Sequence, residues 1–300
     1  MKHYIFALLL MTLACTMNAE IHSEAGEYGF KFMNIPINPV SSALAGRGVH
    51  SSANIGSWIL QPASSAMHSY KAANASHSTW IGDTAYTSMM FSHARRSSHI
   101  GLALRNLSYG EIEKRDETSL YLGTYSPTDI GVSGNYAQRI TPSLYVGANL
   151  HLAYQKLDTA SALALATDLG ITTLTPLKDS RLSFAMRNLG ISNKMDEERV
   201  RLPHSFELDF YKGFSLGEQY LGLETGLVIP PDADLQGHLA SEITLMERLS
   251  LRAGYKFNTD TAGLSAGFGL SLASFNIDYG FAVYTEGLGD VHSFGLSYRF

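Results

Sequence analysis

Apolar and polar side chains alternate along most of this chain with a period of two, from about residue 70 to residue 300. The clearest segment is 249–258, in which the odd-numbered residues are apolar and the even-numbered residues are polar or glycine. Successive side chains of a β-strand point to opposite faces, so the pattern predicts strands with one apolar and one polar face. Because the connections are mostly short and leave no room for crossover helices, we expect an antiparallel sheet.

About fourteen segments follow this pattern, with boundaries uncertain by roughly two to four residues. They lie near residues 70–80, 84–93, 98–109, 119–139, 144–157, 161–174, 181–191, 204–213, 217–229, 236–246, 248–258, 262–272, 274–285 and 290–300. The fourth segment contains Pro127, which predicts a bent strand or a strand followed by a turn. Residues 194–201 are expected to form a longer polar loop.

The length of these segments favours a membrane barrel over a soluble secreted sandwich. Strands of roughly ten residues match the ~9–11 residues of a tilted transmembrane strand and exceed the ~5–6 usual in globular sheets. After the first 20 residues no apolar run reaches 18 residues, and only 16% of all residues are charged. Since backbone groups in lipid must pair within the protein, the sheet has to close. We therefore predict an all-β fold, an antiparallel transmembrane β-barrel of about fourteen strands over residues 67–300.

The N-terminus has the features of a secretory signal peptide. A short basic start is followed by an apolar stretch over residues 4–14 and by a small residue, Ala19, after which we expect cleavage. Residues 1–19 would then be removed, together with Cys15, and the protein would be exported to the bacterial outer membrane. Lipidation of Cys15 is the alternative. Residues 20–66 differ from the rest, because they contain several Pro and Gly and no sustained alternation.

The polar face of the expected strands carries the candidate functional side chains. In a barrel they would line a wet lumen or contact a plug inside it. Asp209 and Glu224 are either an acid pair or ordinary ion partners of nearby arginines or of the plug. The lumen-facing candidates are Arg187, Asp209, Glu224, Glu242, Arg252, Lys256 and Asp278.

No motif for catalysis or cofactor binding is recognisable. The sequence has no G-x-S-x-G, no H-E-x-x-H and no P-loop, and its eleven histidines lack metal-ligand spacing with a carboxylate. We expect no enzymatic activity, no cofactor and no metal site. The net charge of −5, without any block of Lys or Arg, argues against nucleic acid as a partner.

The last expected strand carries a pattern that outer-membrane assembly machinery recognises in bacteria. Its alternate residues are apolar or aromatic and the chain ends in Phe. The predicted assembly signal consists of Phe294, Leu296, Tyr298 and Phe300.

Several motifs, in this order along the chain, resemble those of the PorV/PorQ family of FadL-like outer-membrane barrels. Phe32-Met33-Asn34-Ile35-Pro36 and Ala43-Leu44-Ala45-Gly46-Arg47-Gly48 look like the N-terminal region of that family, and Gln61-Pro62-Ala63 stands where the family usually has Asn-Pro-Ala. The resemblance implies that residues 20–66 fold into the lumen as a hatch. The hatch residues that it selects are Phe32, Asn34, Pro36, Gly46, Gly48, Gln61, Pro62 and Ala63.

Three functions follow from these observations. The resemblance implies a non-enzymatic component of protein secretion or surface attachment of the type IX kind, with outer-membrane lipid, secretion components or proteins with C-terminal signal domains as partners. Its docking surfaces would include loops 194–201 and 285–290. The first alternative is a FadL-like channel for hydrophobic small molecules, gated by the hatch. The second alternative is a soluble secreted β-protein with a binding role.

Overall fold

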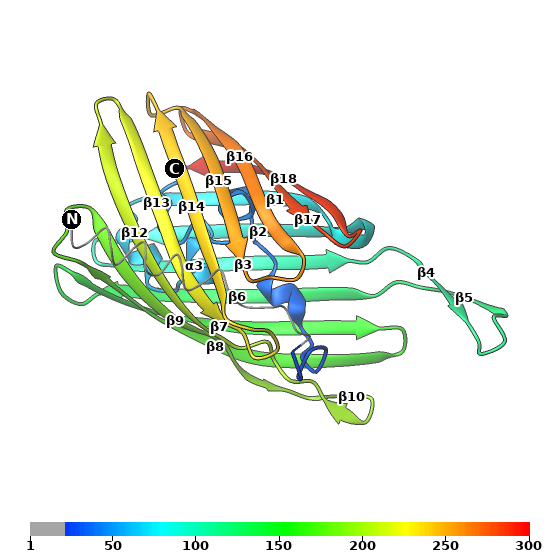
Figure 1. The fold of residues 1–300 in the computed structure, drawn as a ribbon. Helices are drawn as coiled ribbons and strands as arrows, with labels where there is room; N and C mark the ends of the chain where they lie inside the picture. The colour runs from blue at the N-terminus through cyan, green and yellow to red at the C-terminus, as the bar shows by residue number, and fades with distance from the viewer. Residues whose placement is uncertain (1–21) are drawn as a thin grey trace.

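The computed structural model describes residues 22–300, which form a closed antiparallel barrel of fourteen strands around an N-terminal segment (Figure 1). The barrel strands are β1 (Lys71–Trp80), β2 (Thr84–Ala94), β3 (Ser98–Ser108), β6 (Thr128–Arg139), β7 (Leu144–Leu157), β8 (Ala160–Leu174), β9 (Ser180–Ser192), β12 (Ser205–Leu216), β13 (Gln219–Ile229), β14 (Gln236–Leu245), β15 (Leu249–Phe257), β16 (Ala262–Leu272), β17 (Phe275–Tyr284) and β18 (Gly289–Arg299). Each pairs with its neighbour in sequence, and β18 closes the barrel on β1. The predicted fold class is confirmed, and the expected signal peptide lies outside the described residues.

The outer surface of the barrel is apolar, as a lipid-facing wall requires. Outward side chains such as Leu150 and Leu152 are 60% and 47% exposed, whereas the inward His151 between them is buried. The same alternation continues around the barrel, so the period of two seen in the sequence separates lipid-facing from lumen-facing residues. Within residues 22–300, no helix is long and apolar enough to cross a membrane.

The two ends of the barrel differ in the length of their connections. At one end the strands are joined by short turns, such as 95–97, 217–218 and 273–274. At the other end, 109–127 and 193–204 are long and project from the barrel (Figure 1). Transmembrane barrels have short periplasmic turns and longer extracellular loops, so the long-loop end is the extracellular one.

The expected segment at 119–139 is interrupted at Pro127, as its proline indicated. It is divided into β5 (Tyr121–Tyr125) and β6, with Pro127 between them, because proline cannot donate a ladder hydrogen bond. β5 pairs with β4 (Ile112–Arg115) in a hairpin outside the barrel, which the sequence did not predict. The expected loop at 194–201 also contains a short hairpin, β10 (Lys194–Met195) with β11 (Glu198–Arg199).

The segment that precedes the barrel lies inside it (Figure 1). We call residues 30–67 the hatch. Its elements are η1 (Lys31–Asn34), α2 (Pro39–Ala43), α3 (Ser57–Leu60) and η2 (Ser64–Met67), while η3 (Ile81–Asp83) lies in the β1–β2 connection. Helix α2 begins with Pro39 at its first position and with Asn38 as its N-cap, whose side chain accepts a hydrogen bond from Ser41 N. Most hatch side chains are buried, including Trp58, so the barrel wall replaces solvent around them.

Candidate functional site

Close backbone contacts hold part of the hatch against the wall where the strands carry inward glycines. Pro39 packs on Gly280, where an added Cβ would lie 2.4 Å from the Pro39 carbonyl oxygen. Pro62 packs in the same way on Gly147, where a Cβ would also lie 2.4 Å from a carbonyl oxygen. Both glycines are therefore required by the approach of the two backbones.

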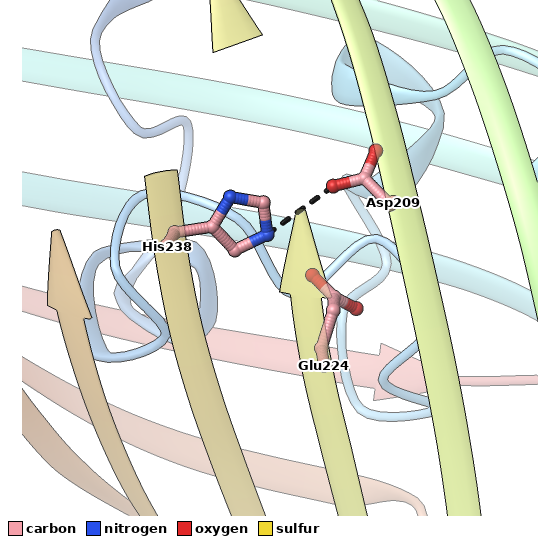
Figure 2. A group of neighbouring side chains, drawn as sticks. All are labelled: Asp209, Glu224 and His238. Carbon is pink, nitrogen blue, oxygen red and sulfur yellow. Dashed lines mark ion pairs between the residues drawn. The ribbon is translucent and has the colours of Figure 1, made fainter. Parts of the chain in front are cut away.

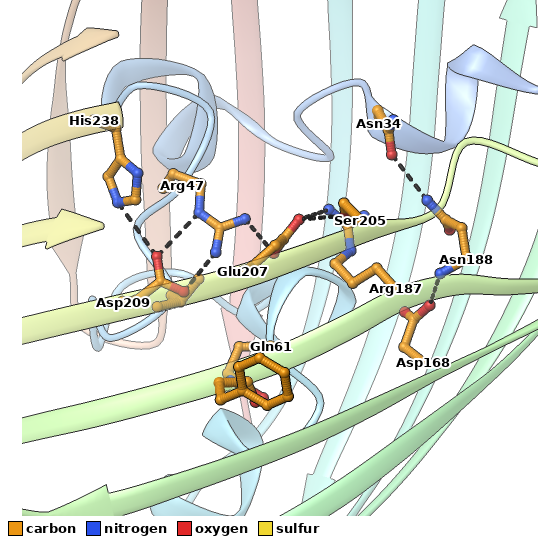
Figure 3. A network of polar contacts seen from close by, with 12 residues as sticks. Asn34, Arg47, Gln61, Asp168, Arg187, Asn188, Ser205, Glu207, Asp209 and His238 are labelled. Atoms are coloured by element: carbon orange, nitrogen blue, oxygen red, sulfur yellow. Dashed lines mark hydrogen bonds and ion pairs between the residues drawn. The ribbon is translucent and has the colours of Figure 1, made fainter. Parts of the chain in front are cut away.

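A second part of the hatch, residues 45–51, is held by charged and polar contacts. Arg47 stands between Gly46 and Gly48, which both have positive φ, and its guanidinium points at β12 (Figure 3). Arg47 Nη2 donates to Asp209 Oδ2 at 2.6 Å, and Arg47 Nη1 donates to Glu207 Oε2 at 2.6 Å. Arg187 Nη1 donates to the other oxygen of Glu207 at 3.0 Å. All four side chains are buried, so two cations and two carboxylates compensate one another in the lumen.

Glu224 on β13 contacts the backbone of the same loop. Its carboxylate accepts hydrogen bonds from the N–H groups of Gly48, Val49 and His50, at 2.9, 3.2 and 3.1 Å. Consecutive N–H groups that converge in this way form an anion-binding nest, which here needs the positive φ of Gly48. We call Arg47, Arg187, Glu207, Asp209 and Glu224 the anchor network.

Two further carboxylates extend these contacts along the wall. Glu242 on β14 accepts hydrogen bonds from Ser51 Oγ at 2.9 Å and from Arg252 Nε at 2.6 Å. Arg252 Nη1 donates in turn to Asp278 Oδ1 at 2.7 Å. The structure thus brings six of the seven predicted lumen residues into ion pairs or hydrogen bonds that contact the hatch or one another. The seventh, Lys256, has no ion pair within the described chain.

Lys256 belongs to a row of inward positions across four adjacent strands. Asp209 is in register with Gly226, Gly226 with His238, and His238 with Lys256. A Cβ on Gly226 would lie 2.6 Å from the ring of His238 and 3.0 Å from Asp209 Oδ1, so the glycine lets these two side chains meet. His238 Nε2 lies 3.3 Å from Asp209 Oδ1. The row therefore runs from the anchor network to an ammonium group without an ion pair in the described chain.

Asp209, Glu224 and His238 also have the composition of a metal site (Figure 2). One ligand atom from each lies within 4.8 Å of the others. Both oxygens of Asp209, however, accept hydrogen bonds from Arg47, and both oxygens of Glu224 accept backbone N–H groups. A cation would have to displace these donors beside a guanidinium, so the geometry favours attachment of the hatch over metal binding.

A β-bulge fixes the position of the hatch near the extracellular end. One residue of β8, Asp168, stands opposite two residues of β9, Arg187 and Asn188. Asn188 has a φ of 53°, and its backbone N donates to Asp168 Oδ1 at 2.7 Å. Its side chain donates to Asn34 Oδ1 of the hatch at 2.9 Å (Figure 3). The bulge thereby directs an amide toward the lumen.

The chain before the hatch lies at the extracellular mouth. Gly29 N donates to Arg201 O at 3.0 Å, and Arg201 pairs with Glu27 at 2.7 Å. Lys31, at the start of the hatch, pairs with Asp232. Tyr28 Oη donates to Glu24, and this hydrogen bond raises the pKa of the Tyr28 phenol. These contacts are mostly exposed and contribute at most about 1 kcal/mol each.

Two cavities lie on different sides of the hatch. A cavity of about 300 Å³ is bounded by hatch residues such as Gly46 and Arg47 and by the wall from β12 to β15. A cavity of about 470 Å³ lies at the short-turn end, between Met67 of the hatch, Tyr145 and the β8–β9 turn. The hatch therefore separates open space near one end of the barrel from open space at the other.

The remaining predicted residues lie as follows. Phe32, Pro36, Gly46, Gly48, Gln61, Pro62 and Ala63 are within the hatch and buried or nearly so, and Asn34 is exposed but bonded to Asn188. Gln61 Nε2 donates to Phe184 O at 3.0 Å. The side chains of Phe294, Leu296, Tyr298 and Phe300 point outward. Arg47, Glu207, Asp168 and Asn188 also take part in these contacts, and the sequence did not predict their roles. A cation between two glycines was the one signal that could have identified Arg47.

Comparison with known proteins identifies solved structures of similar fold. No family model and no curated protein matches the sequence. Among solved structures, the CymD monoaromatic hydrocarbon channel has a TM-score of 0.61 at 13% identity and covers 89% of this chain and 98% of its own. The Pseudomonas putida toluene transporter TodX has a TM-score of 0.61 at 10% identity, covering 86% and 96%. A Pseudomonas aeruginosa FadL homologue has a TM-score of 0.58 at 13% identity, covering 88% and 98%.

These neighbours share the barrel over nearly their whole length. The chain therefore has the fold of FadL-like outer-membrane barrels, and the closed barrel with its apolar exterior indicates a bacterial outer-membrane location. Likeness to the PorV/PorQ branch, cleavage after Ala19 and the expected secretion partners stay predictions.

Proposed function

We propose that this protein is an outer-membrane channel for small molecules, closed by its own hatch. The fold that it shares with a toluene transporter and a monoaromatic hydrocarbon channel supports this function. The observation that carries the proposal is the pair of cavities on different sides of the hatch. Because open space lies toward both ends of the barrel, a local displacement of the hatch is enough to join the two cavities into a passage. The channel function thus takes precedence over the secretion role that the sequence suggested.

Residues 45–51 are the part of the hatch that moves. The segments at Pro39 and Pro62 pack backbone to backbone on the wall, and water would not replace those contacts. Apart from Ala45, whose backbone N packs on Gly254, residues 45–51 contact the wall through hydrogen bonds and ion pairs, for which entering water supplies substitutes. The net loss is ~1.5–3 kcal/mol for each hydrogen bond to a charged group. Arg47 lines the 300 Å³ cavity, which places the movable loop at its boundary.

Uptake across an intact outer membrane tests the channel. Gram-negative cells that express the protein would be compared with cells that carry an empty vector, using radiolabelled toluene at low concentration. We expect faster initial accumulation in the expressing cells, with the folded barrel verified by its heat-dependent shift on a gel. Equal rates at equal cell density, with folded protein present, would overturn the proposal.

One observation favours a second function, docking of a protein partner in secretion or surface attachment. The β4–β5 hairpin projects from the extracellular end (Figure 1), and its Leu120 and Leu122 are 62% and 55% exposed. Exposed apolar side chains on a projecting element are typical of contact surfaces. Deleting residues 112–125 should deplete surface-attached proteins and leave solute uptake intact if the protein has this role. An unchanged surface proteome would contradict it.

A further inference from the structure

Lys256 is the one cation bordering the 300 Å³ cavity that has no ion pair within the described chain. Lys31 is paired with Asp232, and Arg47 and Arg187 are paired with acids of the anchor network. Lys256 follows the inward alternation of β15, two positions beyond Gly254, and borders the cavity. Its ammonium would lie 3.0 Å from a Cβ at Gly46, so it contacts the hatch loop without a charged partner.

The acids that line the same cavity are already neutralised. Glu207 accepts from both Arg47 and Arg187, and Asp232 accepts from Lys31. An ammonium removed from bulk water is costly unless an anion or hydrogen-bond acceptor compensates it. The cavity therefore carries an uncompensated positive charge on its β15 side.

His238 supplies a hydrogen-bonding group directly beside this ammonium. His238 and Lys256 are opposite each other in the β14–β15 ladder and both point inward. Directly opposed residues have Cβ atoms about 4.5–5.5 Å apart, close enough for both side chains to contact one small group. The ring is buried, and His238 Nδ1 has no hydrogen-bond partner in residues 22–300.

We propose that the cavity binds the carboxylate of a compact small molecule, with Lys256 as its counter-ion and His238 as a hydrogen-bond donor. This inference rests on the proposed function, because the bound molecule would be a transported one. It makes the preferred substrate class narrower: a small carboxylate should bind more tightly than an uncharged molecule of the same shape. A volume of about 300 Å³ is at the lower end for ligand pockets and suits a molecule of the size of benzoate.

Calorimetry on the purified, folded protein tests the site with two matched probes, benzoate and benzyl alcohol. They have nearly the same shape and differ in charge. We expect benzoate to bind at least tenfold more tightly than benzyl alcohol, and Lys256→Met to remove this preference. Lys256→Arg should retain most of it, because the charge is kept.

Lys212→Met is the matched control. Lys212 is also on a barrel strand, but it donates to Lys178 O in the β8–β9 turn, away from the 300 Å³ cavity. This variant should bind benzoate like the unaltered protein. Equal affinity for the two probes, or an unchanged benzoate affinity in a folded Lys256→Met variant, would overturn the inference.

The outcomes also separate this inference from the channel itself. If cells take up toluene but the protein does not bind benzoate preferentially, the channel function stands and the carboxylate site is excluded. If the protein binds benzoate through Lys256 but cells take up neither solute, the carboxylate site stands and the channel function is excluded.

Discussion

Arg47 of the hatch donates to both oxygens of Asp209 on β12, from Nε at 3.2 Å and from Nη2 at 2.6 Å. The two residues are 162 positions apart in the sequence, and the pair is buried in the lumen. A paired, planar contact of this kind fixes orientation as well as distance. It positions the loop that borders the 300 Å³ cavity.

Removing the guanidinium should loosen residues 45–51. Arg47→Ala leaves Asp209 buried without its guanidinium and Glu207 with Arg187 alone, and removing one partner of a buried ion pair typically costs ~3–5 kcal/mol. We expect a cysteine placed at the buried Val49 to react with maleimide at least tenfold faster in this background, measured by mass spectrometry. Arg115→Ala, in the exposed β4–β5 hairpin, is the control and should leave the labelling rate unchanged. Identical rates in Arg47→Ala and the control would show that the pair does not hold the loop.

Neutralising Glu224 should expose the backbone that it binds. Glu224→Gln keeps the size of the side chain but leaves a single acceptor oxygen, so at least one of the three hydrogen bonds is lost and the others are no longer charge-assisted. We expect hydrogen exchange at Gly48, Val49 and His50 to become roughly tenfold faster, which corresponds to ~1.4 kcal/mol. The exposed Glu218→Gln is the control. Protection that persists in the variant would argue against the nest.

Adding a methyl group where the hatch contacts the wall should destabilise the folded protein. In Gly147→Ala the new Cβ would lie 2.4 Å from the Pro62 carbonyl oxygen, so either the strand or the hatch must shift. Overpacking of this kind costs ~1–3 kcal/mol. Gly134→Ala is the matched control, since no atom lies within 4 Å of the position that its new methyl group would take. The expected result is a lower thermal unfolding midpoint for Gly147→Ala alone.

Divalent metal ions should not stabilise the protein. A ligand present at about 100 times its Kd raises the free energy of unfolding by ~2.7 kcal/mol. Because Arg47 and the backbone N–H groups occupy the oxygens of Asp209 and Glu224, we expect no shift of the thermal midpoint with Zn²⁺ or with EDTA. A Zn²⁺-dependent increase that disappears in His238→Ala would indicate a metal site instead.

The barrel could be predicted because its physical cause is local. The alternation of inward and outward residues, such as His151 and Leu152, can be read from the sequence. The length of each strand and the proline that interrupts 119–139 can be read from it as well. The β4–β5 hairpin was missed because an aqueous hairpin has no lipid-facing side to impose alternation on Leu120 and its neighbours. The bulge at Asn188 inserts a single residue, which leaves too small a disturbance of the period to recognise.

The candidate site was predictable only as a set of inward positions. Alternation placed Asp209, Glu224 and Lys256 in the lumen, but it contains no information on which partner each one meets across the barrel. Arg47 finds Asp209 only after the hatch has folded inside the closed sheet. Within residues 22–300, Lys256 lacks an acidic partner because Glu207 and Asp232 pair with other cations. Those pairs join separate parts of the chain, so the alternation within one strand cannot predict them.

We expect that movement of residues 45–51 away from the wall opens the passage. It can be tested by joining that loop to the barrel through Ser51→Cys and Glu242→Cys, whose native side chains meet at 2.9 Å. A short crosslinker with two thiol-alkylating groups would be added to expressing cells. The crosslinked fraction would be determined by mass spectrometry, and toluene accumulation would be measured. Uptake should fall toward the level of empty-vector cells in proportion to crosslinking, whereas each single-cysteine variant should retain uptake after the same treatment. Full uptake in a completely crosslinked protein would contradict it.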